Sequence, residues 1–324
     1  MTLDFPLTFN PILKERIWGG DKLTKVFKKG SDTSGIGESW ELSDVDGDVS
    51  IVSNGPLKGK SLKDLIQTYK GKLVGEKVYD AFGNSFPILI KYIDAKTPLS
   101  VQVHPSNELA KTRHNSFGKN EMWYIMEAEE QAELIVGFNQ KLTQKSYKRT
   151  VDEGQILEIL NTEEISKGDT FYIPTGRVHA IGAGVVLAEI QQTSDVTYRI
   201  YDYQRVDVKT GKERELHTEL ALDAIDYKLH DTYKTSYTLE ENKSSELVYS
   251  PYFKTNIIQL KGNLTQDYSS LDSFVIYMCV EGNAEIKCSH NTFQLNFGQT
   301  MLLPASVENV ELKSDNAKLL EVFL

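Results

Sequence analysis

A seven-residue frame that occurs twice constrains the fold more than any other feature of the sequence. Residues 168–174 read Gly-Asp-Thr-Phe-Tyr-Ile-Pro and residues 298–304 read Gly-Gln-Thr-Met-Leu-Leu-Pro, so both follow the pattern G-x5-P. The glycine allows a turn before a short apolar strand, and the proline ends the strand because it has no backbone donor. Two frames with apolar residues at matching places predict a duplicated β-barrel domain.

Short apolar runs separated by turn residues predict that the rest of the chain is also mainly β. After about residue 235 the sequence reads as alternating strands to its end, for example in SFVIYMCVEG. Helices are expected earlier, over about 61–77, from Ser106, over 145–161 and over 218–226. At the first of these helices Ser61 is the expected N-cap, with Asp64 three residues later.

Composition limits the possible classes of function. The chain has 36 Lys and Arg against 46 Asp and Glu, a formal net charge of −10, without a basic stripe or arm, so nucleic-acid binding is not expected. No run approaches the ~18 apolar residues of a membrane span. Cys279 and Cys288 are too few for a disulfide framework, and the first residues lack a secretion signal. We therefore expect a cytoplasmic protein.

Three segments carry side chains that suit a divalent metal. Gln102 and His104 stand two apart in an expected strand, so they project from one face. Glu121 begins the strand EMWYIM, and His179 lies in GDTFYIPTGRVHAI. Each residue alone is typical of a protein core or surface. Together, two imidazoles and two oxygen donors form a mixed set that zinc and related metals prefer.

The surroundings of His179 resemble a known fold family. The second signature motif of the cupin barrel is G-x5-P-x-G-x2-H, and Gly168, Pro174, Gly176 and His179 match each fixed position. The resemblance implies a mainly β protein of two cupin-type barrels, also called double-stranded β-helix or jelly-roll barrels, with helical segments inserted in the N-terminal part.

The two barrels are expected at residues 1–235, the catalytic cupin domain, and at 236–324. In the second frame Ser306 replaces the motif glycine and Asn309 stands at the ligand position. We therefore expect the C-terminal domain to be cupin-like and metal-free.

Seven segments resemble, in order, the short bacterial form of type I mannose-6-phosphate isomerase. They are ERIWGG, GESWELS, PILIKYIDA, LSVQVHPSNELA, KNEMWYIM, FYIPTGRVHAIG and AEIQQTSDVTYRIYDYQR. The resemblance implies a zinc-dependent aldose–ketose isomerase that interconverts mannose 6-phosphate and fructose 6-phosphate through a cis-enediol. Its substrate would be a small phosphorylated sugar. The resemblance also implies that one zinc ion is held by Gln102, His104, Glu121 and His179.

The same resemblance assigns the remaining pocket residues. The implied catalytic residues are Arg199, Lys119, Lys91 and Glu189, and the implied substrate-binding residues are Trp18 and Glu38. An arginine stays charged at any working pH, so Arg199 suits a clamp for phosphate or enediolate charge. The proton-transfer base is left open among the two lysines, Glu189 and a zinc-bound water.

Two other functions are compatible with a cupin fold. One is a bicupin that binds a sugar phosphate without converting it. The other is an iron-dependent cupin dioxygenase, which would use two histidines and a carboxylate. The complete metal-ligand set and the seven segments favour the isomerase.

Overall fold

The computed structural model describes residues 3–30, 33–207, 210–289 and 291–324 and confirms a mainly β chain. By its internal contacts the chain divides into two compact units. The first comprises residues 1–12, 40–91 and 236–324, and the second comprises 13–39 and 92–235. The chain passes from one unit to the other inside three strands, β1 (Ile12–Gly20), β2 (Ile36–Leu42) and β5 (Ile88–Ala95), and again after residue 235.

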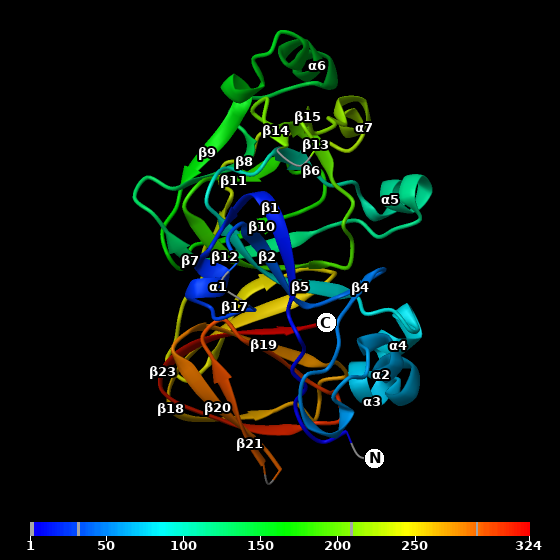
Figure 1. Ribbon diagram of the computed structural model, residues 1–324, viewed down its shortest axis with the longest axis vertical. Coiled ribbons are helices and arrows are strands. Elements are labelled where there is room, and N and C mark those ends of the chain that lie inside the picture. Colours follow the sequence, from blue (N-terminus) through cyan, green and yellow to red (C-terminus); the bar gives the residue numbers. More distant parts are fainter. Residues whose placement is uncertain (1–2, 31–32, 208–209, 290) are drawn as a thin grey trace. The chain divides into compact units, whose positions relative to one another are not determined.

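The second unit is built on two sheets (Figure 1). The seven-stranded sheet has the order β1 (Ile12–Gly20), β2, β5, β12 (Val185–Gln192), β7 (Glu121–Ala128), β10 (Thr170–Ile173) and β16 (Lys234–Thr235). The five-stranded sheet has the order β13 (Tyr198–Tyr201), β6 (Val101–Val103), β11 (His179–Ile181), β8 (Glu133–Phe138) and β9 (Leu160–Glu164). Apolar side chains from both sheets, among them Trp123 and Phe171 from one and Leu134 and Ile181 from the other, form one core.

Helices cover the outer face of the five-stranded sheet. The second unit contains α1 (Lys22–Lys25), α5 (Asn107–His114), α6 (Gln144–Asp152), the 3-10 turn η2 (Ile156–Ile159), α7 (Thr218–Leu222) and the small pair β14 (Val206–Asp207) and β15 (Lys212–Glu213). Tyr147 of α6 and Ala221 of α7 pack with Val101, Val103 and Tyr198 of the sheet. Alternation along each strand sends the neighbouring residues to the opposite, inner face.

The first unit contains a second β core. Its main sheet has the order β17 (Ser244–Tyr249), β18 (Lys254–Asp267), β23 (Asn309–Phe323), β19 (Val275–Glu281) and β22 (Thr300–Leu303), with β20 (Asn283–Cys288) and β21 (Asn291–Asn296) attached. The unit also contains β3 (Asp44–Val45), β4 (Asp48–Val49) and the 3-10 turn η1 (Gly55–Leu57). Residues of six of the sheet's strands share one apolar core.

The two G-x5-P frames form equivalent strands. Gly168 and Gly298 have φ angles of 95° and 74°, in the left-handed region that favours glycine. The strands that follow, β10 and β22, end just before Pro174 and Pro304 and pair antiparallel with β7 and β19. The predicted repetition of this strand is confirmed.

The prediction of one continuous helix over 61–77 is wrong. The segment forms α2 (Leu62–Tyr69), α3 (Gly71–Val74) and α4 (Glu76–Phe82). The chain leaves helical geometry at Lys70, with φ 50°, and at Gly75, with φ 97°. The predicted cap is confirmed, because Ser61 and Asp64 form a reciprocal capping box. The helices predicted over 145–161 and 218–226 are also shorter, since they end at Asp152 and Leu222.

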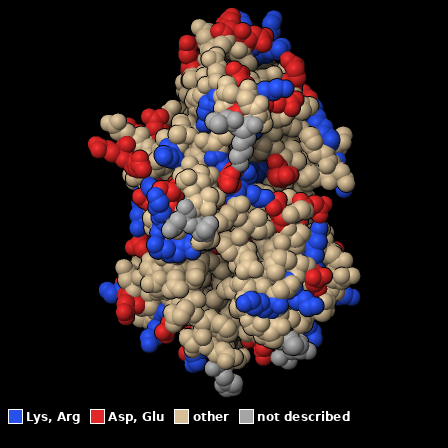
Figure 2. Space-filling model, in the orientation of Figure 1, with Lys and Arg blue, Asp and Glu red and all other residues tan. Residues whose placement is uncertain are grey.

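The structure also bears on the predictions about charge, membrane spans and cysteines. On the face that Figure 2 shows, basic and acidic side chains alternate in small groups. No helix among the described residues is long and apolar enough to span a membrane. Cys279 and Cys288 are buried free thiols, and burial raises their pKa to about 12 and about 11. The cytoplasmic location stays a prediction.

Candidate metal centre

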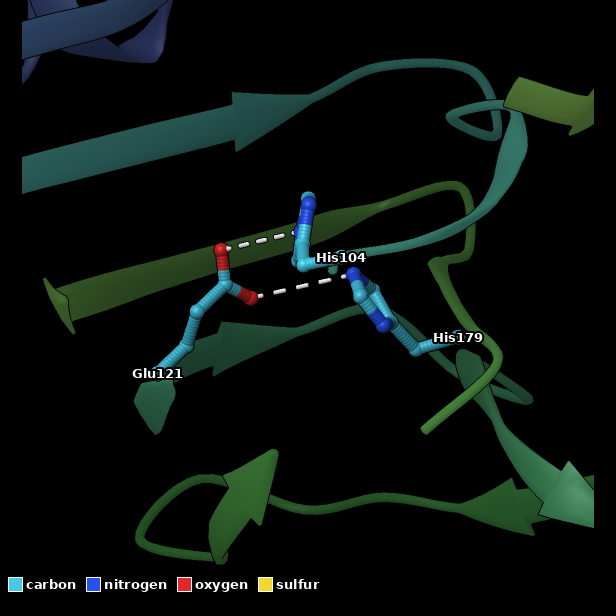
Figure 3. Close-up of side chains that lie close together, drawn as sticks. All are labelled: His104, Glu121 and His179. Atoms are coloured by element: carbon cyan, nitrogen blue, oxygen red, sulfur yellow. Dashed lines mark ion pairs between the residues drawn. The ribbon is translucent and has the colours of Figure 1, made fainter. Parts of the chain in front are cut away.

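The inner faces of the two sheets bring the predicted metal ligands together. In the five-stranded sheet, Gln102 lies opposite His179 on one side and opposite Arg199 on the other. Cross-strand partners share a face, so these three side chains form one row. His104 follows two residues after Gln102, and Glu121 opens β7 in the seven-stranded sheet. Figure 3 shows the Glu121 carboxylate directed at the two imidazoles.

Main-chain carbonyl groups set the orientation of both imidazole rings. His104 Nδ1 lies 2.9 Å from the carbonyl oxygen of Val196, and His179 Nδ1 lies 2.8 Å from that of Arg177. A carbonyl can only accept, so each Nδ1 carries the proton and each Nε2 presents a lone pair. Burial, followed by the charge of Lys119, lowers the pKa of His104 to about 4, and burial also lowers the pKa of His179.

Both Nε2 lone pairs face a buried carboxylate. His104 Nε2 lies 3.3 Å from Glu121 Oε1, and His179 Nε2 lies 3.7 Å from Glu121 Oε2. Glu121 is fully buried, and neither of its oxygens accepts a hydrogen bond of good geometry from the described residues. Burial opposes ionisation of Glu121, but the positive charge of Lys119 acts against burial, and the pKa of Glu121 lies well below its usual range. Three electron-pair donors therefore converge, with the Lys119 ammonium and the Gln102 amide beside them.

This arrangement fits a divalent metal. The candidate ligand atoms of His104, Glu121 and His179 all lie within 4.8 Å of one another. A tetrahedral zinc ion with ligands at ~2.0–2.2 Å places its ligand atoms about 3.3 Å apart, close to the observed separations. Metal-binding histidines usually donate the N–H of their outer ring nitrogen to a carbonyl or carboxylate oxygen, which fixes the orientation of the ring. The donors are therefore suited to a metal before it binds.

Gln102 and Lys119 complete the inner surroundings of these donors. Gln102 Nε2 lies 3.2 Å from His179 Nε2, so the amide reaches the site as the spacing predicts. The Lys119 ammonium is buried, 2.7 Å from Glu121 Oε1 and 3.4 Å from His104 Nε2. Burial favours the neutral amine, but Glu121 and the other nearby carboxylates outweigh it and raise the pKa of Lys119. Lys119 neutralises part of the negative charge at the centre.

Glu189 lies one strand from the carboxylate of Glu121. In β12 it is opposite Trp123, and its Oε2 accepts a hydrogen bond of 2.9 Å from the Trp123 indole. The Trp123 ring also meets the His179 ring edge-on, with centroids 5.3 Å apart. Trp18 is 4% exposed and belongs to the same apolar core. Trp18 therefore contributes to the packing of this core, and substrate binding by Trp18 stays a prediction.

The structure places Glu38 and Lys91 in different surroundings. Glu38 accepts a hydrogen bond of 2.7 Å from Arg16, and its charge contributes to the raised pKa of Lys119. Lys91 is buried in β5, and its ammonium lies over the Trp40 ring, 5.3 Å from the ring centroid. Lys91 and Trp40 belong to the first unit. The catalytic role of Lys91 stays a prediction.

Arg199 is half-buried beside Gln102. Its Nη1 donates to the carbonyl oxygen of Glu215 at 2.9 Å, whereas its buried Nε has no hydrogen-bond partner among the described residues. Burial, together with Arg214, lowers the pKa of Arg199 from its very high ordinary value. One donor of the guanidinium is thus held by the protein, and another has no acceptor among the described residues.

The structure brings to the site two further residues, Gln191 and His217, that no sequence motif indicates. Gln191 is fully buried, lies opposite Glu121 in the sheet, and donates through Nε2 to two carbonyl oxygens while its Oε1 accepts no hydrogen bond from the described residues. Its position two residues after Glu189 in a strand is a signal that could have found it. His217, which holds the backbone of Arg199, has no such signal in its local sequence.

Comparison with known proteins decides the family. Residues 7–150 match the catalytic domain of type I phosphomannose isomerase, and residues 243–324 match the cupin domain of mannose-6-phosphate isomerase. The probable mannose-6-phosphate isomerase GmuF of Bacillus subtilis is 35% identical over 303 residues, which cover 93% of each chain. The mannose-6-phosphate isomerase ManA of the same organism is 34% identical, over 95% of this chain and 96% of its own.

The chain belongs to the type I phosphomannose isomerase family. The crystal structure of the mannose 6-phosphate isomerase from Bacillus subtilis superposes on it with a TM-score of 0.89, at 31% identity, over 98% of this chain and 99% of the other. The family's reaction is an aldose–ketose isomerisation, which confirms the predicted enzyme class. The match to the cupin domain and the superposition confirm the predicted cupin fold.

Not all of the site falls within the two family matches. His104, Lys119 and Glu121 lie in the catalytic-domain match of the phosphomannose isomerases. His179 and Arg199 lie between the two matches, in residues 151–242. The structure nevertheless brings His179 to Glu121 and places Arg199 in the same row, so the intervening segment belongs to the same site.

Proposed function

We propose that the chain interconverts mannose 6-phosphate and fructose 6-phosphate with one zinc ion held by His104, Glu121, His179 and Gln102. The observation that carries the proposal is the convergence of three buried electron-pair donors in a phosphomannose isomerase fold. The curated relatives carry the same activity in their names. The two imidazoles and the carboxylate suit zinc, and Gln102 would be the weakest of the four ligands because its amide is neutral.

The proposed reaction moves a proton between C1 and C2 of the open-chain sugar through a cis-enediol. When bound, zinc would supply a Lewis acid for the sugar oxygens. The remaining task of the protein is to stabilise negative charge on those oxygens while the proton is away from carbon. The burial of Trp123 and Glu121 supports this task, because charges act more strongly where water is excluded.

Arg199 is proposed to clamp the negative charge of the substrate, either on the phosphate or on the enediolate. Its unpartnered Nε supports this role, because a buried N–H without an acceptor is costly unless a ligand supplies one. A guanidinium is a poor base, since it stays charged at any working pH. Arg199 therefore binds and orients, and does not exchange the proton.

Four groups are candidates for the transfer of the proton between the two carbons. Lys119 and Glu189 are both buried within the second unit, and both belong to the surroundings of Glu121. Lys91 and a zinc-bound water remain the other candidates.

We also propose that residues 1–235 are the catalytic cupin domain, that 236–324 are a metal-free cupin-like domain, and that the protein works in the cytoplasm.

A coupled assay tests the proposed function. Purified protein is stripped with a chelator, reconstituted with zinc or with ferrous iron, and measured for metal content and for turnover of mannose 6-phosphate. We expect turnover to disappear on chelation and to return with zinc. Zinc-loaded protein that does not convert mannose 6-phosphate, or turnover that survives complete metal removal, would contradict the proposal.

A further inference from the structure

The strand that carries Arg199 has an unusual outer edge. β13 is the last strand of the five-stranded sheet and pairs on one side with β6 (Figure 1). On the other side, a single residue, His217, forms the main-chain hydrogen bonds that a neighbouring strand would form with Arg199. The backbone N–H of His217 donates to the carbonyl oxygen of Arg199 at 2.7 Å, and the backbone N–H of Arg199 donates to His217 Nδ1 at 3.1 Å. His217 thus satisfies both main-chain groups of Arg199.

The second of these hydrogen bonds depends on the chemistry of the imidazole. A backbone N–H can only donate, so Nδ1 of His217 must carry a lone pair, and the ring proton lies on Nε2. An apolar side chain at position 217 would leave the N–H of Arg199 without this acceptor. An asparagine would keep an acceptor, because its Oδ1 is bonded to the same side-chain carbon position as Nδ1 of histidine.

The same segment also holds the Arg199 side chain. Glu215, two residues before His217, accepts the hydrogen bond from Arg199 Nη1 through its carbonyl oxygen. We call residues 214–217 the clasp. The clasp therefore contacts Arg199 at its N–H, its carbonyl and its guanidinium, while the Nε that we assign to substrate lies outside these contacts.

The clasp is anchored at both ends. At its start, Arg214 Nε donates to Asp202 Oδ2 at 2.8 Å, and Asp202 directly follows β13. At its end, the carbonyl oxygen of His217 accepts from the N–H of Ala221 in α7. Side chains of α7 pack in the same apolar cluster as Tyr198 of β13. Because the clasp is held at both ends, its contacts can fix the position of Arg199.

We infer that His217 is a positioning residue for Arg199, which it holds in register on the sheet edge next to Gln102. This inference rests on the role of Arg199 proposed above. Misplacement of a catalytic group by about 1 Å can cost about 100-fold in rate. Loss of one of three contacts should move Arg199 less, so we expect a fall of about 10-fold in kcat/KM.

The test compares variants of the full, zinc-loaded chain. His217→Leu and His217→Ala remove the acceptor, and His217→Asn keeps it. We expect the first two to lower kcat/KM about 10-fold and the third to retain activity within about 3-fold, with unchanged zinc content in all three. The inference is overturned by a His217→Leu or His217→Ala enzyme with wild-type kinetics, or by equal losses in the asparagine and apolar variants.

A double-mutant cycle separates this inference from the role of Arg199. In an Arg199→Lys background, His217→Leu should lower kcat/KM by less than about 2-fold, because its effect passes through Arg199. Full multiplication of the two losses would overturn the inference and leave the role of Arg199 standing. A wild-type rate for Arg199→Lys alone would overturn the proposed role of Arg199 and the inference with it.

Discussion

At the scale of single residues, the site depends on which nitrogen of each histidine carries the proton. Val196 and Arg177 hold the Nδ1 atoms of His104 and His179 through their carbonyl oxygens, so both Nε2 atoms face Glu121. The Lys119 ammonium, 2.7 Å from Glu121 Oε1, offsets part of the repulsion between the carboxylate and the two lone pairs. The proposed zinc ion, bound by all three, would offset the rest of this repulsion.

Replacement of His179 tests this explanation. We expect His179→Ala to lose most of its zinc and its turnover together, because the remaining donors no longer surround the ion. Metal analysis and the isomerase assay measure the two losses. His230→Ala is the matched control, since His230 is half-buried and its only described carboxylate contact is Asp226 at 3.4 Å. Full zinc occupancy in His179→Ala would remove His179 from the ligand set.

At the scale of elements, helix termini show how local and distant signals differ. The cap of α2 comes from Ser61 and Asp64, which are neighbours in sequence. The cap of α4 comes from Asp272, whose two carboxylate oxygens accept from the N–H groups of Glu76 and Lys77 at 2.7 and 3.1 Å. Both caps satisfy backbone donors that a helix cannot satisfy itself. Only the first can be read from a sequence pattern.

Removal of either cap should destabilise the protein to a similar extent. We expect Ser61→Ala and Asp272→Ala each to lower the free energy of unfolding by about 1 kcal/mol, measured by denaturant titration. Asp272→Asn keeps one acceptor oxygen and should lose less than the alanine variant. An Asp272→Ala protein as stable as the wild type would show that this distant carboxylate does not stabilise α4.

The break of the 61–77 segment into three helices has a different cause. Its apolar residues keep a helical period, so the sequence pattern predicts one helix. Lys70 and Gly75 nevertheless adopt positive φ angles. A Cβ at Gly75 would lie 2.4 Å from the carbonyl oxygen of Asp272, so the close approach of a distant segment requires glycine there. Tertiary packing overrides the local period at this point.

At the scale of the whole molecule, the acidic composition makes stability depend on how carboxylates are paired. Asp202 is buried and accepts hydrogen bonds from Arg205 and Arg214. Burial raises the pKa of Asp202, but the two arginines outweigh burial and lower it below its ordinary value of 3.8. The ionised form is therefore bound more tightly in the folded state, and the stability that it contributes is present above about pH 4.

The lowered pKa of Asp202 gives a prediction for the stability of the protein in acid. We expect Asp202→Asn to unfold more easily than the wild type at pH 7, with a difference that shrinks as the pH falls below 4 and Asp202 takes up a proton. Denaturant titrations at several pH values measure the difference. Asp46→Asn is the control, because Asp46 is exposed beside Lys63 and should matter little at any pH. A difference that grows at low pH would contradict the assignment.

The sequence by itself determined the β-rich character, the repeated strand frame and the capping box at Ser61, and it pointed to His104, Glu121 and His179 as candidate metal ligands. These signals are local, because strand alternation, caps and short motifs depend on residues a few positions apart. Tertiary structure alone decided the histidine tautomers, the cap from Asp272, and the hold of His217 on Arg199. Each of these contacts joins residues that only the register of distant strands and loops brings within hydrogen-bonding distance.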